Sequence, residues 1–552
     1  MKTHEVFNQS PPLEEYDLFA SDKVLQEAVQ RESNGQADGQ ALAGFGQKIG
    51  QARIIDLGRQ ANTYLPVLKS FDRFGFRQDR VEFHPAYHEL MQCSVSQGIH
   101  ASPWEHLVSG KPAAPARNVS RQAALYMMTQ IEPGHICPIT MTNASVPTLL
   151  FQPNLAASWL PKITTRDYDP SFIPMADKRG VTLGMGMTEK QGGTDVRSNT
   201  TTATPATRPG PGEEYLLIGH KWFFSAPMCD AFLVLAQAEK GLSCFLLPRF
   251  LPDGTLNNLH IQRLKEKTGN RANASSEVEF SNAHAWLIGE EGCGIRNIIE
   301  MASWTRLDCA VSSAGMMRQT LIQALHHCQH RQVFGTPLIR QPLMQNVLAD
   351  LALEAEACTV LAFRVSRAFD QADDDEAEAG YRRLMTPVAK YWNCKRAPGF
   401  TMEAMECLGG NGYVDETVSA RLYREAPVNA IWEGSGNVMC LDVLRVLDRE
   451  PHALDSVLAE LEKSRGRDRD YDQTLEQLKR SLGNREALQA GVRQFVEQLA
   501  LISIAGLLLE HAPDFISQTW CCTRLGQARG LYGCLPVTSP FGLILDRAWS
   551  AT

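Results

Sequence analysis

Short strand-like segments are confined to one part of this chain, and they restrict its possible folds more than any other feature. Residues 181–187, 215–225, 231–238, 242–248 and 276–280 are apolar or alternate in polarity. Turn-rich stretches separate them, above all 203–213 with its three prolines and two glycines. Several short strands in succession predict a β-barrel or sandwich of about 120 residues.

Helical patterns lie on both sides of this block. Residues 121–130 and 147–160 carry apolar side chains at helical spacing, and helical periodicity returns at about residue 293. Pro342 should open a long helix, because a missing N–H costs little in the first turn. The expected apolar stripe of that helix follows spacings of three and four: Leu343, Val347, Leu351, Ala355, Cys358 and Ala362.

These patterns predict a multidomain α+β protein. The expected parts are an N-terminal arm (1–40), an N-terminal helical domain (41–180), a middle β domain (181–292), a helical bundle (293–440) and an appended C-terminal helical domain (441–552).

Composition excludes some classes of protein. A net charge of −8 argues against a dedicated nucleic-acid binder, although it allows a local basic patch. The fourteen scattered cysteines are typical of small buried hydrophobes in a reducing compartment. The first residues lack the apolar core of a secretory signal, and the longest apolar run, 499–509, is too short to span a bilayer. We expect a soluble, cytoplasmic protein without a membrane partner.

Residues 406–437 form the first candidate site. Gly409, Gly410 and Gly412 fall within four positions, and glycine backbones that approach a ligand closely can hold phosphate through their N–H groups. Further on, Glu433 lies between Trp432 and Gly434, where desolvation would make a carboxylate a better base. The alternative interpretation is a helix–loop–helix corner with a surface glutamate.

Residues 186–198 form the second candidate site. Hydroxyls, glycines and carboxylates alternate just after a predicted strand. Such a loop can bind a polar cofactor through its N–H groups and hydroxyls, or it can be an ordinary surface loop.

Together the two stretches resemble the two signatures of the acyl-CoA dehydrogenase flavoprotein family. Residues 186–198 are similar to the first signature at every constrained position, and residues 406–425 are similar to the second. The order of helices, β domain and helices also matches, and the resemblance covers roughly residues 60–440. The second signature is in register at Gly409, Gly410, Gly412, Tyr413, Glu416, Arg421 and Glu425.

The resemblance implies FAD, a homotetramer and a set of cofactor-binding residues. Ser225 takes the position of the threonine that faces flavin N5, and Phe223 stands where many members have tryptophan. Arg331 and Phe334 match a segment that reaches the FAD of a neighbouring subunit; an arginine fork suits a pyrophosphate. Glu406 replaces a glutamine near the pyrophosphate, an unfavourable position for an acid unless Arg331 or another cation offsets its charge. The remaining candidate ligands are Met187, Thr188, Gly193, Thr194, Gly409, Gly410, Ser435 and Asn437.

The implied reaction is α,β-dehydrogenation of an acyl-CoA or related thioester. A base removes the α-proton while hydride leaves the β-carbon for flavin N5. Thr305 occupies the position from which some branched-chain members supply the base, and a hydroxyl cannot do that work. The resemblance therefore leaves Glu433 as the catalytic residue.

Two alternatives remain open from the sequence. One is a DNA-binding, alkylation-response flavoprotein with little dehydrogenase turnover, since relatives with an added C-terminal domain are associated with DNA; the other is an acyl-CoA-binding regulator. Residues 441–552 hold 13 lysines and arginines against 15 acidic residues, so a surface for double-stranded DNA must be local. The best basic cluster is Arg465, Arg467, Arg469, Lys479 and Arg480; it could equally be a solvated helix face.

His326 and His330 lie four residues apart on a predicted helix, but no third ligand is evident. We expect no metal site.

Overall fold

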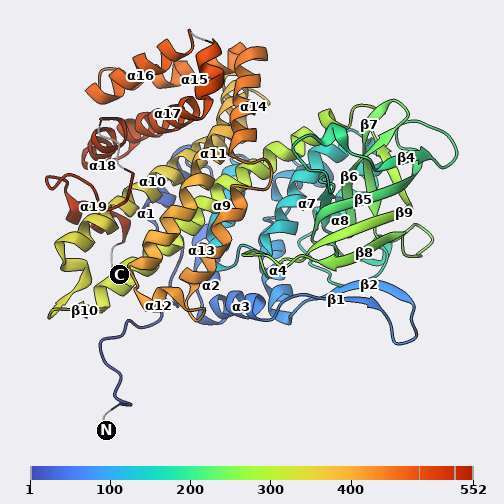
Figure 1. The fold of residues 1–552 in the computed structure, drawn as a ribbon, viewed down its shortest axis with the longest axis horizontal. Helices are drawn as coiled ribbons and strands as arrows, with labels where there is room; N and C mark the ends of the chain where they lie inside the picture. The colour runs from blue at the N-terminus through green and yellow to red at the C-terminus, as the bar shows by residue number, and fades with distance from the viewer. Residues whose placement is uncertain (1–2, 484, 527–529, 550–552) are drawn as a thin grey trace. The chain divides into compact units, whose positions relative to one another are not determined.

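The computed structural model describes residues 3–483, 485–526 and 530–549. The chain divides into two compact units (Figure 1). The helical unit comprises residues 1–52, 115–130 and 306–552, and the sheet unit comprises residues 53–114 and 131–305. Each is described by itself.

The sheet unit is built around seven strands: β3 (Leu183–Gly186), β4 (Thr202–Pro205), β5 (Glu214–Ser225), β6 (Ala231–Ala238), β7 (Gly241–Pro248), β8 (Leu259–Leu264) and β9 (Ser275–Ile288). They pair in the order β3-β6-β4-β5-β9-β7, with β8 on β9, and a further pairing of β6 with β7 closes a ring. Closure leaves β6 and β7 buried along most of their length, which explains their continuous apolar sequences.

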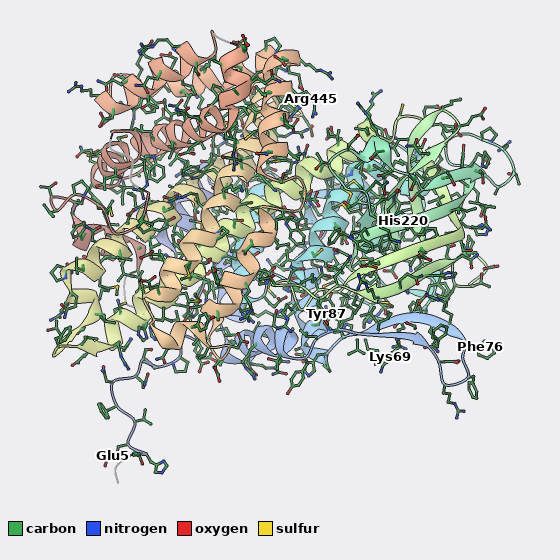
Figure 2. All side chains as sticks on the ribbon, viewed as in Figure 1. Glu5, Lys69, Phe76, Tyr87, His220 and Arg445 are labelled. Carbon is green, nitrogen blue, oxygen red and sulfur yellow. The ribbon has the colours of Figure 1, made fainter. Side chains whose placement is uncertain are left out.

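Five of these strands lie where the sequence predicts them, and two were missed. Strand β4 reads TATP and is short and mostly polar, and the alternation in β8 (LHIQRL) covers only its first four residues. Their β structure comes from pairing with β5 and β9. A separate hairpin of β1 (Val67–Phe71) and β2 (Arg77–Glu82) was also missed, because its sequence is largely polar and exposed; Figure 2 shows Lys69 and Phe76 on it.

The helices of the N-terminal half are α1 (Lys23–Glu32), α2 (Gly39–Ile49), α3 (Ala52–Thr63), α4 (Pro85–Gln97), α5 (His106–Ser109), α6 (Arg117–Ile131), α7 (Ile136–Leu149) and α8 (Pro153–Ile163). Residues 1–40 are therefore not an arm throughout. Asp22 and Asp38 cap α1 and α2 by accepting from Leu25 N and Ala41 N, and this capping ends the irregular segment.

Helix α9 (Gly294–His330) belongs to the sheet unit up to Thr305 and to the helical unit from Arg306. The helical unit continues through α10 (Pro342–Gln371), α11 (Glu376–Glu406), α12 (Gly410–Tyr413), α13 (Val418–Asn429) and α14 (Gly436–Arg449). The added helices are α15 (Pro451–Glu462), α16 (Arg469–Ser481), α17 (Arg485–His511), α18 (Asp514–Trp520) and α19 (Phe541–Ala548). The structure confirms the predicted fold class: helices, a β domain, a helical bundle and further helices.

Helix α10 begins at Pro342 as predicted, but the prediction of a single apolar stripe is wrong. Every side chain from Leu348 to Ser366 is buried, while Leu343 is 86% exposed. Helices α1, α11, α17 and α19 all pack on α10, so it is enclosed on all sides.

The compact units cut across the predicted domain ranges. Residues 1–52 and 115–130 group with the C-terminal helices, whereas 53–114 group with the sheet. The contact of α1 with α10 accounts for part of this grouping. The five sequence ranges stay a prediction.

Helix α17 is longer than the apolar run that the sequence shows. Within the described residues, its segment Glu486–His511 alone is long and apolar enough to cross a membrane. In the structure, 61% of the most apolar part is buried against the protein, where α17 packs on α10, α11, α14 and α16. Such burial is typical of a core helix.

Candidate active site

The loop after β3 is built on a buried carboxylate. Glu189 is fully buried and accepts hydrogen bonds from Lys221 Nζ at 2.7 Å, Thr200 N at 2.7 Å and Thr201 N at 3.1 Å. Lys221 on β5 is equally buried, and its ammonium also donates to Leu235 O at 2.8 Å. Glu189 therefore anchors the loop from inside and is not available to a ligand.

Glu189 and Lys221 each stabilise the charged form of the other. Burial would raise the pKa of Glu189, but hydrogen bonds from Lys221 and Thr201 outweigh it and hold the pKa well below its usual range. Burial lowers the pKa of Lys221, and Glu189 opposes that shift. The two side chains form a fully buried ion pair with Nζ and Oε1 2.7 Å apart, so the loss of one partner would leave a buried charge alone.

The exposed side of the same loop carries the predicted flavin ligands. Trp222 N donates to Thr188 O at 2.8 Å and Asn199 Nδ2 donates to Met187 O at 3.0 Å, so the protein fixes the backbone. The hydroxyls of Thr188 and Thr194 make no hydrogen bond to other described residues. A Cβ at Gly193 would lie 2.3 Å from Thr188 Oγ1, so any residue other than glycine would displace that hydroxyl. The loop thus keeps free donors and a glycine gap, as a polar cofactor requires.

A β-bulge in β5 directs the other two predicted flavin residues outward. Lys221 and Phe224 are three positions apart, whereas their partners Val278 and Ser276 on β9 are two apart. The extra residue keeps both Lys221 and Phe224 buried. It leaves Phe223 53% exposed and Ser225 half-buried, with Ser225 Oγ 3.1 Å from Ser275 Oγ.

In the helical unit, the three glycines after α11 have different roles. Gly409 has φ +60°, a conformation that favours glycine. A Cβ on Gly412 would lie 2.3 Å from Met405 O, so tight packing demands glycine there. A Cβ on Gly409 or Gly410 would meet nothing within 4 Å, and exposed Glu406 ends the preceding helix. This open backbone fits the approach of a phosphate.

The N-terminal arm contacts two segments: residues 409–412, here called the glycine corner, and residues 331–337, here called the Arg331 turn. Arg331 Nη1 donates to Asn8 O at 2.7 Å, and Asn8 also exchanges two hydrogen bonds with Gln332. Asn411 Nδ2 donates to Gln9 Oε1 at 3.3 Å. The structure therefore brings Arg331 and the glycine corner to one stretch of the arm, which the sequence analysis did not assign to the site.

The turn after Arg331 presents an apolar side chain to the outside. Phe334 lies between β10 (Gln332–Val333) and β11 (Thr336–Pro337), with φ +55° and 95% of its surface exposed. A left-handed aromatic residue without burial has no stabilising role within its own chain.

Glu433 lies in a strained loop that two cations hold. Its φ is +58°, which costs on the order of 1–3 kcal/mol for a non-glycine residue. Lys390 Nζ donates to Trp432 O at 2.8 Å and also to Gly434 O, while Arg306 Nε donates to Glu433 O at 3.2 Å. Three consecutive carbonyls are thus fixed, and the half-buried Glu433 side chain starts from a defined position.

The clamp extends to α14. Arg306 Nη1 pairs with Asp442 Oδ2 at 2.7 Å, and Arg383 Nη2 donates to Asp442 Oδ1 at 3.1 Å. Burial raises the pKa of Asp442, but these two arginines outweigh it and lower the pKa. Ser435 and Asn437 lie exposed at the start of α14, where helix N–H groups have no partner within the helix.

Lys390 and Arg306 were missed by sequence reasoning. Each is a cation inside a long, largely buried helix, and that placement is the signal that could have found them.

Two members of the basic cluster of the added helices, Arg465 and Lys479, pair with acidic neighbours. Arg465 contacts Glu462 and Glu476, and Lys479 contacts Glu462. Arg467 donates to Leu509 O at 2.9 Å, and Arg480 Nε donates to Glu476 O at 3.2 Å. Exposed pairs of this kind are typical of a solvated helix face. DNA binding by Arg465, Arg467, Arg469, Lys479 and Arg480 stays a prediction.

Comparison with known proteins agrees with this architecture. Residues 8–170 match the adaptive response protein AidB N-terminal domain, 184–283 the acyl-CoA dehydrogenase middle domain, and 292–447 the acyl-CoA dehydrogenase C-terminal domain. The chain therefore belongs to the acyl-CoA dehydrogenase family.

Within that family it groups with AidB. It is 47% identical to AidB of Escherichia coli (strain K12) over 96% of both chains. It is 30% identical to acyl-CoA dehydrogenase family member 11 of Caenorhabditis elegans, over 93% of this chain and 82% of that protein. The crystal structure of Caenorhabditis elegans ACDH-11 in complex with C11-CoA superposes with a TM-score of 0.84, 28% identity and 96% coverage of each chain.

Replacing Lys221 by methionine should lower the free energy of unfolding by about 3–5 kcal/mol, because Glu189 would stay buried without its cation. Urea unfolding followed by circular dichroism would measure the loss. Exposed Lys190 in the same loop supplies the control: Lys190→Met should cost much less. Equal stability of Lys221→Met and wild type would contradict the anchoring role of the pair.

Proposed function

We propose that this protein binds FAD and catalyses α,β-dehydrogenation of an acyl thioester, with Glu433 as the base. The observation that carries this proposal is the clamped, left-handed loop of Glu433, since strain that is actively maintained is typical of functional positions. Membership of the family supports oxidoreductase activity in general. The C11-CoA complex of ACDH-11 supports an acyl-CoA as the substrate class.

The residues of the sheet unit suit an isoalloxazine ring. The exposed ring of Phe223 offers an aromatic face, the Ser225 hydroxyl offers a donor at the position of the family threonine, and Thr188 and Thr194 offer free hydroxyls. FAD, when bound, supplies the acceptor for the hydride that leaves the substrate. These side chains would hold and orient the ring when FAD is bound.

The residues of the helical unit perform the proton transfer. Glu433 would take the α-proton on its carboxylate. Lys390 and Arg306 do not take part in that transfer; they hold the main chain and so fix the position from which the carboxylate starts. A loop without these bonds would relax its strained φ and displace the base.

The Arg331 turn is the basis for proposing that subunit assembly supports cofactor binding. An exposed Phe334 beside a half-buried arginine gives that turn an apolar and a cationic contact for another chain. We assign it to a homotetramer in which Arg331, Glu406, Gly409 and Gly410 approach the cofactor pyrophosphate of a neighbouring subunit.

Glu433→Gln should keep FAD bound and lower acyl-CoA dehydrogenation by at least roughly 10²–10⁴-fold, because the amide keeps the size of the side chain but cannot accept the proton. Anaerobic flavin bleaching with a panel of acyl-CoAs measures the rate. Glu239→Gln, an exposed change in the turn between β6 and β7, is the control. Equally slow bleaching of wild type and Glu433→Gln with every thioester would refute dehydrogenation by this residue.

Lys390→Met should lower the bleaching rate by roughly 10- to 100-fold with FAD content unchanged, because Trp432 O and Gly434 O lose their donor and the base shifts. Lys390→Arg, which keeps a charged donor, should recover part of the rate. If Lys390→Met lowers stability but leaves the rate per folded, flavin-loaded subunit at the wild-type value, then Lys390 serves folding alone.

Arg331→Ala should lower both FAD occupancy and the assembly state, because binding across subunits couples them by mass action. Flavin absorbance and light scattering on one sample measure the two quantities. Arg340→Ala, an exposed change on the same connection, should alter neither. Unchanged FAD affinity in Arg331→Ala would remove the cross-subunit assignment while leaving the role of Glu433 intact.

A further inference from the structure

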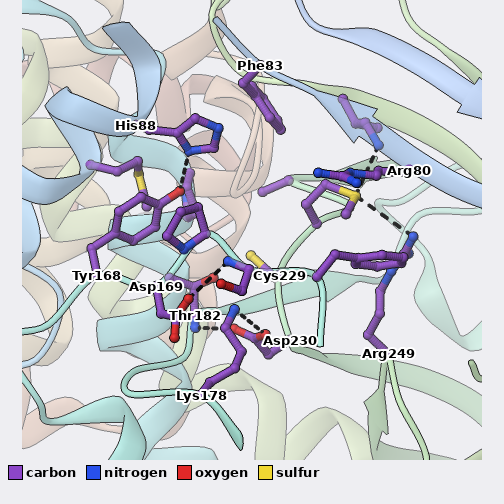
Figure 3. A pocket seen from close by; sticks show the side chains of 18 of the residues that line it. Arg80, Phe83, His88, Tyr168, Asp169, Lys178, Thr182, Cys229, Asp230 and Arg249 are labelled. Carbon is purple, nitrogen blue, oxygen red and sulfur yellow. Dashed lines mark hydrogen bonds and ion pairs between the residues drawn. The ribbon is translucent and has the colours of Figure 1, made fainter. Parts of the chain in front are cut away.

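The sheet unit contains a cavity of about 310 Å³ that none of the candidate site residues lines (Figure 3). Lys178 Nζ and Asp230 Oδ1, which both line it, form an ion pair at 2.7 Å. Its charged lining residues balance at neutral pH: Arg80, Lys178 and Arg249 against Glu82, Asp169 and Asp230. This cavity therefore has no net charge with which to select a ligand. The N-terminal arm of the helical unit, by contrast, contacts a residue that we assign to the cofactor.

The arm runs along the end of α9 in the direction opposite to the helix. Tyr16 Oη donates to Gln319 Oε1 at 3.0 Å, and His326 Nε2 donates to Pro11 O at 2.9 Å. From residue 16 back to residue 11, the partners thus move toward the C-terminal end of α9. Bonds at several points along the helix hold the arm in register, so its earlier residues reach the Arg331 turn in a defined position.

Asn8 is the residue at which the arm meets that turn. Its side chain bonds both main-chain groups of Gln332: Nδ2 donates to Gln332 O at 2.8 Å, and Gln332 N donates to Oδ1 at 2.7 Å. The main chain of Asn8 is left-handed, with φ +54°, a conformation that asparagine adopts more readily than most residues. Conformation and side chain together fix the carbonyl of Asn8, which accepts from Arg331 Nη1 at 2.7 Å.

This bond uses one of the five N–H groups of the Arg331 guanidinium. Among the residues that the structure describes, the half-buried Arg331 side chain makes no other hydrogen bond or ion pair. An arginine loses rotamer freedom when it binds a phosphate, and a side chain that is already held loses less. The arm also leaves the glycine corner open, since a Cβ on Gly409 or Gly410 would meet nothing within 4 Å. The arm therefore steadies the arginine without covering the backbone beside it.

We propose that Asn8 is a positioning residue for the cofactor: it holds the Arg331 guanidinium in the position from which it binds the pyrophosphate of FAD. The inference rests on the proposed function, because it requires FAD at Arg331. Asn8 itself does not touch the cofactor, and the arginine fork supplies the charge and the donors. Gln9 Oε1 accepts from Asn411 Nδ2 at 3.3 Å, so the same stretch of the arm also contacts the glycine corner.

Asn8→Val should weaken FAD binding roughly tenfold, because valine cannot bond Gln332 and disfavours a left-handed main chain, so Arg331 loses its fixed acceptor. Serial dilution of the flavin-loaded protein, with free flavin measured by fluorescence, gives the dissociation constant. Asn8→Asp keeps the acceptor for Gln332 N and tolerates the same φ, so it should recover part of the affinity.

Asn34→Val is the matched control. Asn34 is exposed and also left-handed, with φ +50°, but it lies between α1 and α2. The same substitution there should leave FAD affinity at the wild-type value. Wild-type affinity in Asn8→Val would overturn the proposal, and so would tighter binding, because the arm would then compete with the cofactor for Arg331.

A double variant separates positioning from a general effect on folding. If Asn8 acts through Arg331, then Asn8→Val should weaken FAD binding no further once Arg331→Ala is present. Losses that simply add in the double variant would refute the positioning role. A wild-type protein that binds no FAD would instead refute the proposed function, so the two failures are distinguishable.

Discussion

A buried lysine supports each of the two loops that carry the candidate chemistry. Lys221 holds the loop after β3 through Glu189, and Lys390 holds the Glu433 loop through two main-chain carbonyls. In each unit the cation is sequestered from water, so its hydrogen bonds are strong and its removal is costly. The exposed side of each loop is thereby left to a ligand, because the protein already fixes the inner side.

The sequence predicts those parts of the fold whose pattern is local. Strands β6 and β7 are continuous apolar runs, and Pro342 marks the start of α10 through the chemistry of a helix N-terminus. Strands β4 and β8 have no such pattern, because neighbouring strands supply their structure. The burial of α10 on all sides also follows from tertiary packing, which a helical stripe cannot express.

The candidate site divides in the same way. Gly193, Gly409 and Glu433 stand out in the sequence because their residue types are unusual for their surroundings. Lys390, Arg306 and Asn8 act through main-chain carbonyls far away in sequence, so no local pattern points to them. Glu189 shows the opposite case, in which a sequence signature does not reveal a residue's role. It belongs to the first signature, yet its buried carboxylate bonds the loop itself and not a cofactor.

The arm that binds the Arg331 turn has a consequence for the order of folding. Asn8 and Gln332 are 324 residues apart in sequence, so their hydrogen bonds close a very long loop. Contacts of such high sequence separation form late, after local helices have organised the ends that they join. During synthesis the arm leaves the ribosome long before its partner exists. The Arg331 turn should therefore be among the last parts of the helical unit to become ordered, and the cofactor binding that we propose for that turn would coincide with the completion of folding.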